Sequence, residues 1–440
     1  MGAPQTTLLR GGTLVTMDGE RRVLRADLRM EQGRIEAIGK LRKRAGDTVV
    51  DASDMLVLPG LIQTHVHLCQ ALFRNLADDL PLLDWLKERI WPFEGAHDAS
   101  SMRASAELGL AEMMTAGTTT ILDMGSVHHQ DAVFRAMAKS GIRGASGKAM
   151  MDAGSEVPKT LRESTRASLR ESNALADQWH QKGRLRYAYA PRFILSCTER
   201  LWREVAEIAP ARGCMIHSHA AEHAEERAAV KALLGQDDIA ALRSYGIHGA
   251  HVALAHGVQL RKGEMKRLGK DGTRIVHCPS ANLKLASGIA DVVAMRKLGM
   301  VVGLGADGAP CNNRLDPWTE LRSAALLAKG KRLDASALPA REALELLTTS
   351  GAKLLSMEDK IGSLEVGKFA DVIAVDRDGL HQLPGDDPYS QLVYATTASD
   401  VRHVFVQGEW IVQNRVHRHL DAARVRARAK GALKKLLARL

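Results

Sequence analysis

The stretch 59-PGLIQTHVHL-68 places two histidines at the end of a short apolar run. Its Pro-Gly pair is typical of a turn, and the residues that follow are typical of a short buried strand. Side chains two residues apart on a strand point to the same face, so His65 and His67 direct their imidazoles at one point. Imidazole nitrogens bind Zn²⁺ and Fe²⁺. Because an isolated pair of this spacing is common, the interpretation depends on further ligands elsewhere in the chain.

Matching groups lie at the ends of three other apolar runs. They are His219 and Glu222 in CMIHSHAAE (214–222), His256 in VALAHG (252–257) and Asp307 in VVGLGADG (301–308). Four of the six groups can hold one divalent metal with a coordination position left open for water, and the other two can handle protons beside it. This combination predicts a metal-dependent hydrolase site.

Eight apolar runs of strand length alternate with stretches long enough for helices. The first ends near His67, and the others lie at 118–124, 142–150, 185–193, 214–220, 251–257, 274–279 and 301–308. This alternation is typical of a (β/α)₈ barrel, whose active-site residues lie at the C-terminal ends of the strands. The candidate residues all occupy such ends, so the pattern and the chemistry agree.

Residues 7–50 and the C-terminal part of the chain have a different sequence pattern, in which short strand-like runs alternate with turns. Each part alone is too small for a stable sheet, so we expect them to pair into one small β-sandwich. The expected domains are 1–57 and 366–415 for the sandwich, 58–365 for the barrel and 416–440 for a basic C-terminal helix.

The C-terminal segment carries much of the net charge of +10, because residues 416–440 contain eight Lys and Arg and one acid. Four leucines recur at helical spacing and predict that the helix docks on the body of the protein through this stripe. They are Leu433, Leu436, Leu437 and Leu440. No nucleic-acid-binding motif accompanies the charge, so we expect no nucleic-acid partner.

The composition is that of a globular protein, with 440 residues, 45% of them hydrophobic, and a mean hydropathy of −0.16. No apolar stretch approaches the roughly 18 residues of a transmembrane helix, and no signal-peptide pattern opens the chain. The five cysteines are odd in number and lack a CxxC pair, which indicates reduced thiols. We therefore expect a cytoplasmic protein without a membrane partner.

Six motifs make the chain similar to the amidohydrolase superfamily, and within it to the branch of cytosine and guanine deaminases and triazine hydrolases. They are PGLIQTHVH, HAAE, AHG, HCPSANLKL, GADGAPCNN and IGSLEVGKFADVIAVD (361–376), and the resemblance covers nearly the whole chain. It implies that the metal ligands are His65, His67, His219 and Asp307. It also implies that His256 contacts the metal-bound water and that Glu222 shuttles protons.

The number of metals depends on one position. Two-metal members of the resembled family bridge their ions with a modified lysine at the end of the fourth strand, and here that end, residues 189–193, reads YAPRF. We therefore predict a single divalent metal, with Zn²⁺ favoured over Fe²⁺, although Lys148 lies near the end of the third strand. Such a metal lowers the pKa of bound water from about 15.7 toward 7, and Asp307 can accept the proton that this water loses.

Residues around the site differ in the substrate that they indicate. Gln70 and Arg192 resemble positions that contact the purine in guanine deaminases, although a salt bridge at the barrel rim would also explain Arg192. The stretches 82–94 and 306–326 resemble instead the deaminases of S-adenosylhomocysteine, methylthioadenosine and 5′-deoxyadenosine.

If the substrate is a nucleoside, Trp85 forms an apolar wall against it and Asp84 binds the ribose hydroxyls, although Trp85 would equally suit packing on the barrel. His277 and Asn282 are expected to shape the site near the seventh strand. The favoured function is hydrolytic deamination of an aminopurine nucleoside, with release of ammonia. Deamination of guanine or of a pterin-type free base is the alternative, and triazine hydrolysis is a third. As in the resembled family, we expect a homo-oligomer.

Overall fold

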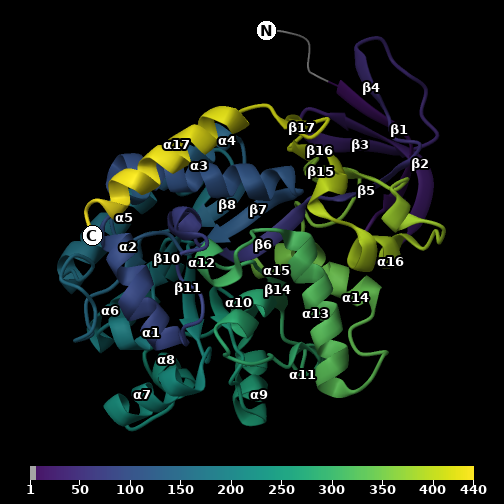
Figure 1. Cartoon of the computed structure of the whole chain (residues 1–440). Helices are drawn as coiled ribbons and strands as arrows, with labels where there is room; N and C mark the ends of the chain where they lie inside the picture. Colours follow the sequence, from purple (N-terminus) through teal and green to yellow (C-terminus); the bar gives the residue numbers. More distant parts are fainter. Residues whose placement is uncertain (1–5) are drawn as a thin grey trace.

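The computed structural model describes residues 6–440, and its centre is a closed barrel of parallel strands (Figure 1). In the order in which they hydrogen-bond, the strands are β6 (Leu61–Val66), β7 (Thr118–Asp123), β8 (Arg143–Ser146), β10 (Leu185–Pro191), β11 (Met215–Ala220), β12 (Val252–His256), β13 (Arg274–His277) and β14 (Val302–Leu304). β14 pairs again with β6, and the short β9 (Ala149–Met150) pairs with the end of β10. The predicted (β/α)₈ barrel is confirmed.

Helices join the strands and surround the barrel (Figure 1). The α-helices are α1 (Leu82–Trp85), α2 (Trp91–Gly95), α3 (Ala99–Thr115), α4 (Gln130–Ser140), α5 (Thr165–Trp179), α6 (Glu199–Ala211), α7 (Ala224–Leu234), α8 (Asp238–Ser244), α9 (Lys262–Asp271), α10 (Pro279–Lys284), α11 (Val292–Lys297), α12 (Ala309–Asn312), α13 (Pro317–Arg332), α14 (Ala340–Glu345), α15 (Thr349–Leu354) and α16 (Pro388–Ser390). The 3₁₀ turn η1 (Leu68–Phe73) follows β6, and a π-helical turn, η2 (Leu86–Ile90), joins α1 to α2.

The barrel closes where β14 meets β6, and this contact requires a glycine. Leu304 pairs with Gln63, and three residues further on Asp307 donates its backbone N–H to the carbonyl of His65 at 3.1 Å. A Cβ atom at Gly305 would lie 2.4 Å from that carbonyl oxygen and 2.7 Å from the backbone nitrogen of His65. Any side chain at position 305 would therefore push the last strand away from the first.

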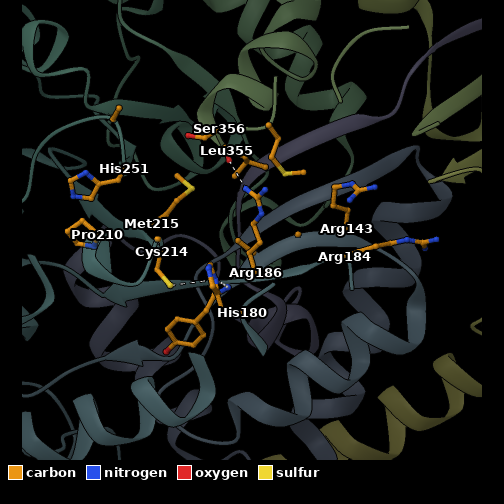
Figure 2. Close-up of a pocket in the computed structure, with 16 residues that line it drawn as sticks. Arg143, His180, Arg184, Arg186, Pro210, Cys214, Met215, His251, Leu355 and Ser356 are labelled. Atoms are coloured by element: carbon orange, nitrogen blue, oxygen red, sulfur yellow. Dashed lines mark hydrogen bonds between the residues drawn. The ribbon is translucent and has the colours of Figure 1, made fainter. Parts of the chain in front are cut away.

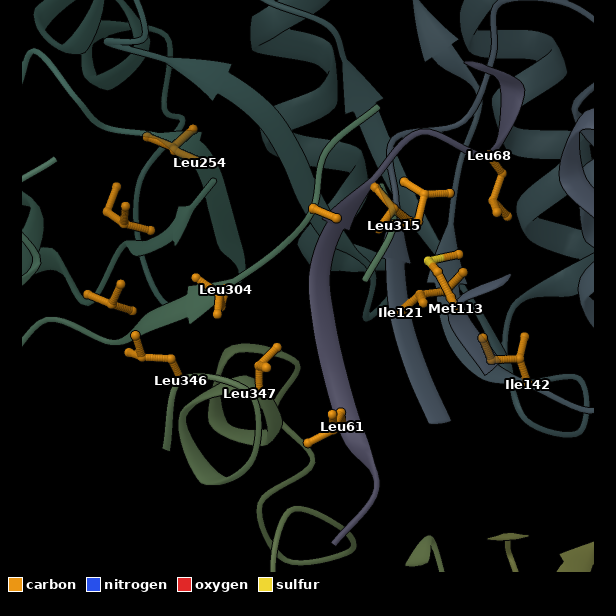
Figure 3. Close-up of a cluster of buried hydrophobic side chains, with 14 of the residues drawn as sticks. Leu61, Leu68, Met113, Ile121, Ile142, Leu254, Leu304, Leu315, Leu346 and Leu347 are labelled. Carbon is orange, nitrogen blue, oxygen red and sulfur yellow. The ribbon is translucent and has the colours of Figure 1, made fainter. Parts of the chain in front are cut away.

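Aliphatic side chains fill the space between the barrel strands and the helices and segments that surround them. Figure 3 shows Leu61 on β6 and Leu304 on β14 near Leu346 and Leu347, which precede α15. All four side chains are fully buried. Leu347 also accepts a backbone hydrogen bond from Ile62 at 2.8 Å, so the segment before α15 is fixed to the first barrel strand.

The two ends of the chain pair with each other, as predicted, and form one mixed sheet. Its spatial order is β18 (Val416–His417), β17 (Glu409–Gln413), β16 (Val401–Val406), β15 (Val372–Asp376), β5 (Met55–Pro59), β1 (Thr6–Val15), β2 (Val23–Glu31) and β3 (Arg34–Gly39), with β4 (Asp47–Asp51) on β1. Antiparallel pairing of β5 with β15 joins the two ends. Because side chains alternate along a strand, Leu56 and Leu58 pack in the core of the barrel and Val57 in the core of the sheet.

The C-terminal helix, α17 (Ala422–Leu437), lies along α3 (Figure 1), but only part of the leucine stripe belongs to its docking face. Its buried residues are Val425, Ala429 and Leu436, whereas Leu437 and Leu440 are exposed. Of the predicted stripe only Leu436 is fully buried, because the rest of the docking ridge passes through Val425 and Ala429, and the small side chain of alanine lets two helices approach closely.

Two ion pairs hold α17 in place on the barrel. Arg428 binds Glu107 of α3, and Arg439 binds Asp98, the N-cap residue of α3, at 2.7 Å. Part of the basic charge that the sequence concentrates in this helix therefore has acidic partners on the protein itself.

Two further expectations concern the whole chain. Within residues 6–440, no helix is both long and apolar enough to cross a bilayer. The five cysteines all lie in this range, where each is buried and unpaired, as expected for reduced thiols.

We predict that Gly305→Ala destabilises the protein, because the added methyl group collides with the backbone of His65. Overpacking of this kind costs about 1–3 kcal/mol. Gly330→Ala in α13 is the control, since a Cβ there meets no atom within 4 Å. Replacing a glycine inside a helix should stabilise the protein by about 0.5–1 kcal/mol. Urea unfolding measures both variants, and equal free energies of unfolding would contradict the role of Gly305.

Candidate metal centre

The predicted metal ligands come together at the C-terminal end of the barrel. His65 lies in β6, His67 directly follows it, His219 lies in β11 and Asp307 follows β14. Asp307 Oδ1 lies 3.2 Å from His65 Nε2 and 3.3 Å from His67 Nε2. The Nε2 atoms of His67 and His219 lie 3.2 Å apart. The structure thus brings three imidazoles and a carboxylate to one point.

A histidine that the sequence reasoning missed, His217, determines how His65 faces this point. His217 donates from Nδ1 to the carbonyl of Ala253 at 3.1 Å, so its Nε2 carries no proton and accepts from His65 Nδ1 at 2.8 Å. The Nε2 atom of His65 is left with a free lone pair and, within residues 6–440, has no hydrogen-bond partner. The sequence did contain a signal, because His217 and His219 repeat the spacing of His65 and His67.

Two further rings are oriented in the same way. His219 donates from Nδ1 to the carbonyl of Arg192 at 2.8 Å, and His256 donates from Nδ1 to the amide oxygen of Asn282 at 2.8 Å. Each ring therefore turns an unprotonated Nε2 toward the centre. Hydrogen bonds from the far nitrogen of an imidazole to a carbonyl are the usual support of a metal-ligating histidine. The residues present fit a divalent cation.

Electrostatics keep these groups in the forms that bind a cation. Burial lowers the pKa of His67 and of His219 well below the usual range, so both rings are neutral. Burial alone would raise the pKa of Asp307, but its close contacts with the surrounding imidazoles, that of His65 first, hold it well below its usual range. The carboxylate is therefore ionised beside neutral imidazoles.

Glu222 and His256 form the proton-handling side of the centre. Glu222 Oε2 lies 3.4 Å from His256 Nε2, which in turn lies 3.9 Å from Asp307 Oδ2. Burial, then the charges of Asp307 and Glu226, raise the pKa of Glu222 well above its usual range. Burial lowers the pKa of His256 to about 4. The arrangement places a carboxyl group whose pKa is raised next to an imidazole whose pKa is lowered.

The centre opens into a small cavity of about 30 Å³. Three of the predicted substrate-binding residues line it: Gln70, Trp85 and Arg192. Of the others, Asn282 supports His256, and His277 is buried with no hydrogen-bond partner for its Nδ1 within residues 6–440. Asp84 is exposed on α1, so its contact with a ribose stays a prediction.

A second residue that the sequence reasoning missed, Glu94, lies behind the polar wall of this cavity and binds two of the residues that line it. Arg192 binds both of its carboxylate oxygens, at 2.5 and 3.2 Å, and Gln70 donates to it at 2.8 Å. All three side chains are buried. Glu94 sits in α2 among apolar residues, and its partners lie far away in the sequence, so no local pattern indicates its role.

Lys148 lies away from the metal ligands. Its ammonium group binds Glu163 at 2.8 Å and Glu171 at 3.2 Å, and it donates to the carbonyl of Val127. A lysine held in this way is not available to bridge two metals.

A closed parallel barrel with a histidine and aspartate donor set at its strand ends defines a class of metal-dependent hydrolases. The chain belongs to the amidohydrolase family, which it matches over residues 56–411. The predicted family is thus confirmed, and enzymes of this family depend on a metal.

Related proteins are similar to this chain over nearly its whole length. The 5-methylthioadenosine/S-adenosylhomocysteine deaminase of Moorella thermoacetica is 38% identical over 383 residues, which are 87% of each chain. The 5′-deoxyadenosine deaminase of Methanosarcina barkeri is 35% identical over 436 residues, 98% of this chain and 99% of that protein. An adenosine deaminase from Xanthomonas campestris, solved with bound zinc, is 30% identical and superposes with a TM-score of 0.93 over 98% of both chains.

We predict that His217→Leu weakens metal binding by about 10- to 100-fold, the usual effect of losing a hydrogen bond that supports a ligand. Without the acceptor at position 217, His65 loses the partner that fixes its proton on Nδ1. His217→Gln is the matched control, because an amide oxygen can accept from His65 while the amide NH₂ donates to Ala253. Metal affinity is measured by competition with a chelator. Equal affinities in the two variants would contradict the role of His217.

Proposed function

We propose that the protein is a hydrolytic deaminase of an aminopurine nucleoside of the 5′-deoxyadenosine, methylthioadenosine or S-adenosylhomocysteine type, and that it releases ammonia. The observation that carries the proposal is Glu222, whose carboxyl group is buried, has a pKa raised by that burial and faces His256 beside Asp307. Loss of ammonia from a ring carbon requires a proton at the ring nitrogen and another at the leaving group, which one such carboxyl can supply in turn. The names of the relatives support the same reaction.

The cation proposed for this site is a single divalent metal, Zn²⁺, held by His65, His67, His219 and Asp307. When bound, it supplies a water that loses its proton near neutral pH. The choice of one metal is supported by Lys148, which is engaged with Glu163 and Glu171. The choice of zinc is supported by the zinc-bound adenosine deaminase of Xanthomonas campestris.

Three side chains transfer protons or orient the attacking water. Asp307 has Oδ1 near His65 and His67 and Oδ2 toward His256, so its second oxygen is free to accept the proton of the attacking water. His256, whose proton is fixed on Nδ1 by Asn282, orients that water through Nε2. Glu222 protonates the ring nitrogen as the neighbouring carbon becomes tetrahedral, takes up the proton of the new hydroxyl group and passes it to the departing ammonia. The proton held by Asp307 then returns to Glu222.

The cavity must widen for a nucleoside, since about 30 Å³ has room for only a few water molecules. Leu82, Trp85 and Leu86 cover it from α1 and the π-helical turn that follows. We propose that this segment moves outward for the substrate and returns with Asp84 on the ribose and Trp85 against the base. Phe193 borders both this cavity and a neighbouring one of about 740 Å³, which offers room for a 5′ substituent.

The alternative, a free base such as guanine, would use Gln70 and Arg192 to contact the ring. In the structure both of these side chains are bound to Glu94, so a base would have to replace those hydrogen bonds. The nucleoside proposal needs no such exchange.

The proposal is tested by loading the purified protein with Zn²⁺ and measuring ammonia release from 5′-deoxyadenosine, methylthioadenosine, S-adenosylhomocysteine and guanine in parallel. We expect turnover of at least one nucleoside and little of guanine. Preferential turnover of guanine would refute the nucleoside proposal, and metal-loaded protein inactive on all four would refute the deaminase proposal for these substrates.

We predict that Glu222→Gln lowers kcat by about 10²–10⁴-fold, because the amide cannot shuttle a proton. Metal content should stay unchanged, since Glu222 is not among the proposed ligands. Glu225→Gln, which changes an exposed acid three residues further on, should leave kcat unchanged. The proton-shuttle role would be excluded by a Glu222→Gln enzyme that retains most of its activity.

A further inference from the structure

A second cavity, of about 380 Å³, is lined by residues at the starts of several barrel strands (Figure 2). Its walls come from the first residues of strands: Arg143 begins β8, Arg186 is the second residue of β10, Met215 begins β11 and His251 directly precedes β12. The proposed metal ligands lie at or beyond the other ends of the strands. The two cavities are therefore separate.

Arg186 is the residue that gives this cavity its chemical character. The half-buried guanidinium makes one hydrogen bond, to the carbonyl of Leu355 at 3.3 Å (Figure 2). Among residues 6–440, no carboxylate lies within ion-pair distance of it. Burial, followed by the charge of Arg143, lowers the pKa of Arg186, so its surroundings disfavour a cation that lacks an anion.

The two other arginines of the cavity do have acidic partners. Arg143 binds both oxygens of Asp371, at 2.7 and 3.1 Å, and Arg184 binds Glu409 at 2.7 Å. Because these two pairs are neutral overall, the positive charge of Arg186 remains uncompensated.

The rest of the lining combines an apolar wall with a few polar groups. The apolar residues are Ala145, Pro210, Met215, Leu355 and Met357. One of the polar groups is the ring of His251. Its Nε2 atom is buried and, within residues 6–440, has no hydrogen-bond partner. A concave apolar surface of a few hundred Å³ with a small number of convergent polar groups is the usual form of a small-molecule site.

We propose that this cavity is a second ligand site, which binds a small organic anion. Its carboxylate or phosphate group pairs with the guanidinium of Arg186, which presents N–H donors in a fork that matches both groups. Its apolar body packs on Met215, Leu355 and Met357, and His251 offers a further hydrogen bond. The ligand would connect the starts of β10, β11 and β12, the strands that lead to Arg192, His219 and His256.

The site is tested by calorimetric titration of the zinc-loaded protein with benzoate, phenyl phosphate, inorganic phosphate and benzamide. Benzoate and phenyl phosphate distinguish a carboxylate head from a phosphate head, and inorganic phosphate lacks the apolar body. Benzamide has the same ring as benzoate without the charge. We expect at least one of the two aromatic anions to bind clearly more tightly than benzamide and inorganic phosphate.

Variants locate the binding. Arg186→Gln should weaken it by about tenfold or more, as expected for the loss of a charge-assisted hydrogen bond. Ala250→Phe, in an exposed turn at the cavity, should obstruct it without removing any charge. Arg322→Gln, an exposed arginine on α13, should leave it unchanged, and so should Asp307→Asn at the metal centre. Failure of both aromatic anions to bind, or equal binding by wild type, Arg186→Gln and Ala250→Phe, would overturn the proposal.

Discussion

Asp307 donates its backbone N–H to the carbonyl of His65, and at this hydrogen bond the last strand of the barrel meets the first. The same two residues contribute a carboxylate and an imidazole to the metal centre, so closing the barrel and assembling the donor set are one structural event. The backbone approach depends on Gly305, where even a methyl group would displace β14. The other histidines come from strands that the closed barrel places around this junction. Geometry that would be hard to hold on loops is thereby fixed by strand pairing.

Burying so many imidazoles in one place is unfavourable unless their protons are controlled. The structure controls them with a series of acceptors: the carbonyls of Ala253 and Arg192, the amide of Asn282 and the ring of His217. Each fixes a proton on the side of a ring that faces away from the centre, which leaves lone pairs directed inward. Charged histidines would repel one another and a metal, so this arrangement lowers the cost of burial and prepares the site for a cation.

Strand order, barrel type and the histidines at strand ends were predictable from sequence, because they follow from local periodicity and from groups placed next to apolar runs. The joining of the two chain ends was predictable because neither end suffices for a sheet. What local pattern could not show was pairing between distant residues. Glu94 is meaningful only with Arg192 and Gln70, and the docking face of α17 only with α3. The unpaired charge of Arg186 emerges only after the partners of its neighbours are known.

The pairing of β5 with β15 has a consequence for the chain during its synthesis on the ribosome. β5 is made early, just before the first barrel strand, but β15 is translated only after the last barrel strand. Until then one edge of β5 presents unpaired backbone groups, which is a known starting point for aggregation. A chain released before β15 is made would keep that edge exposed. Incomplete copies therefore expose a strand edge that the complete chain covers.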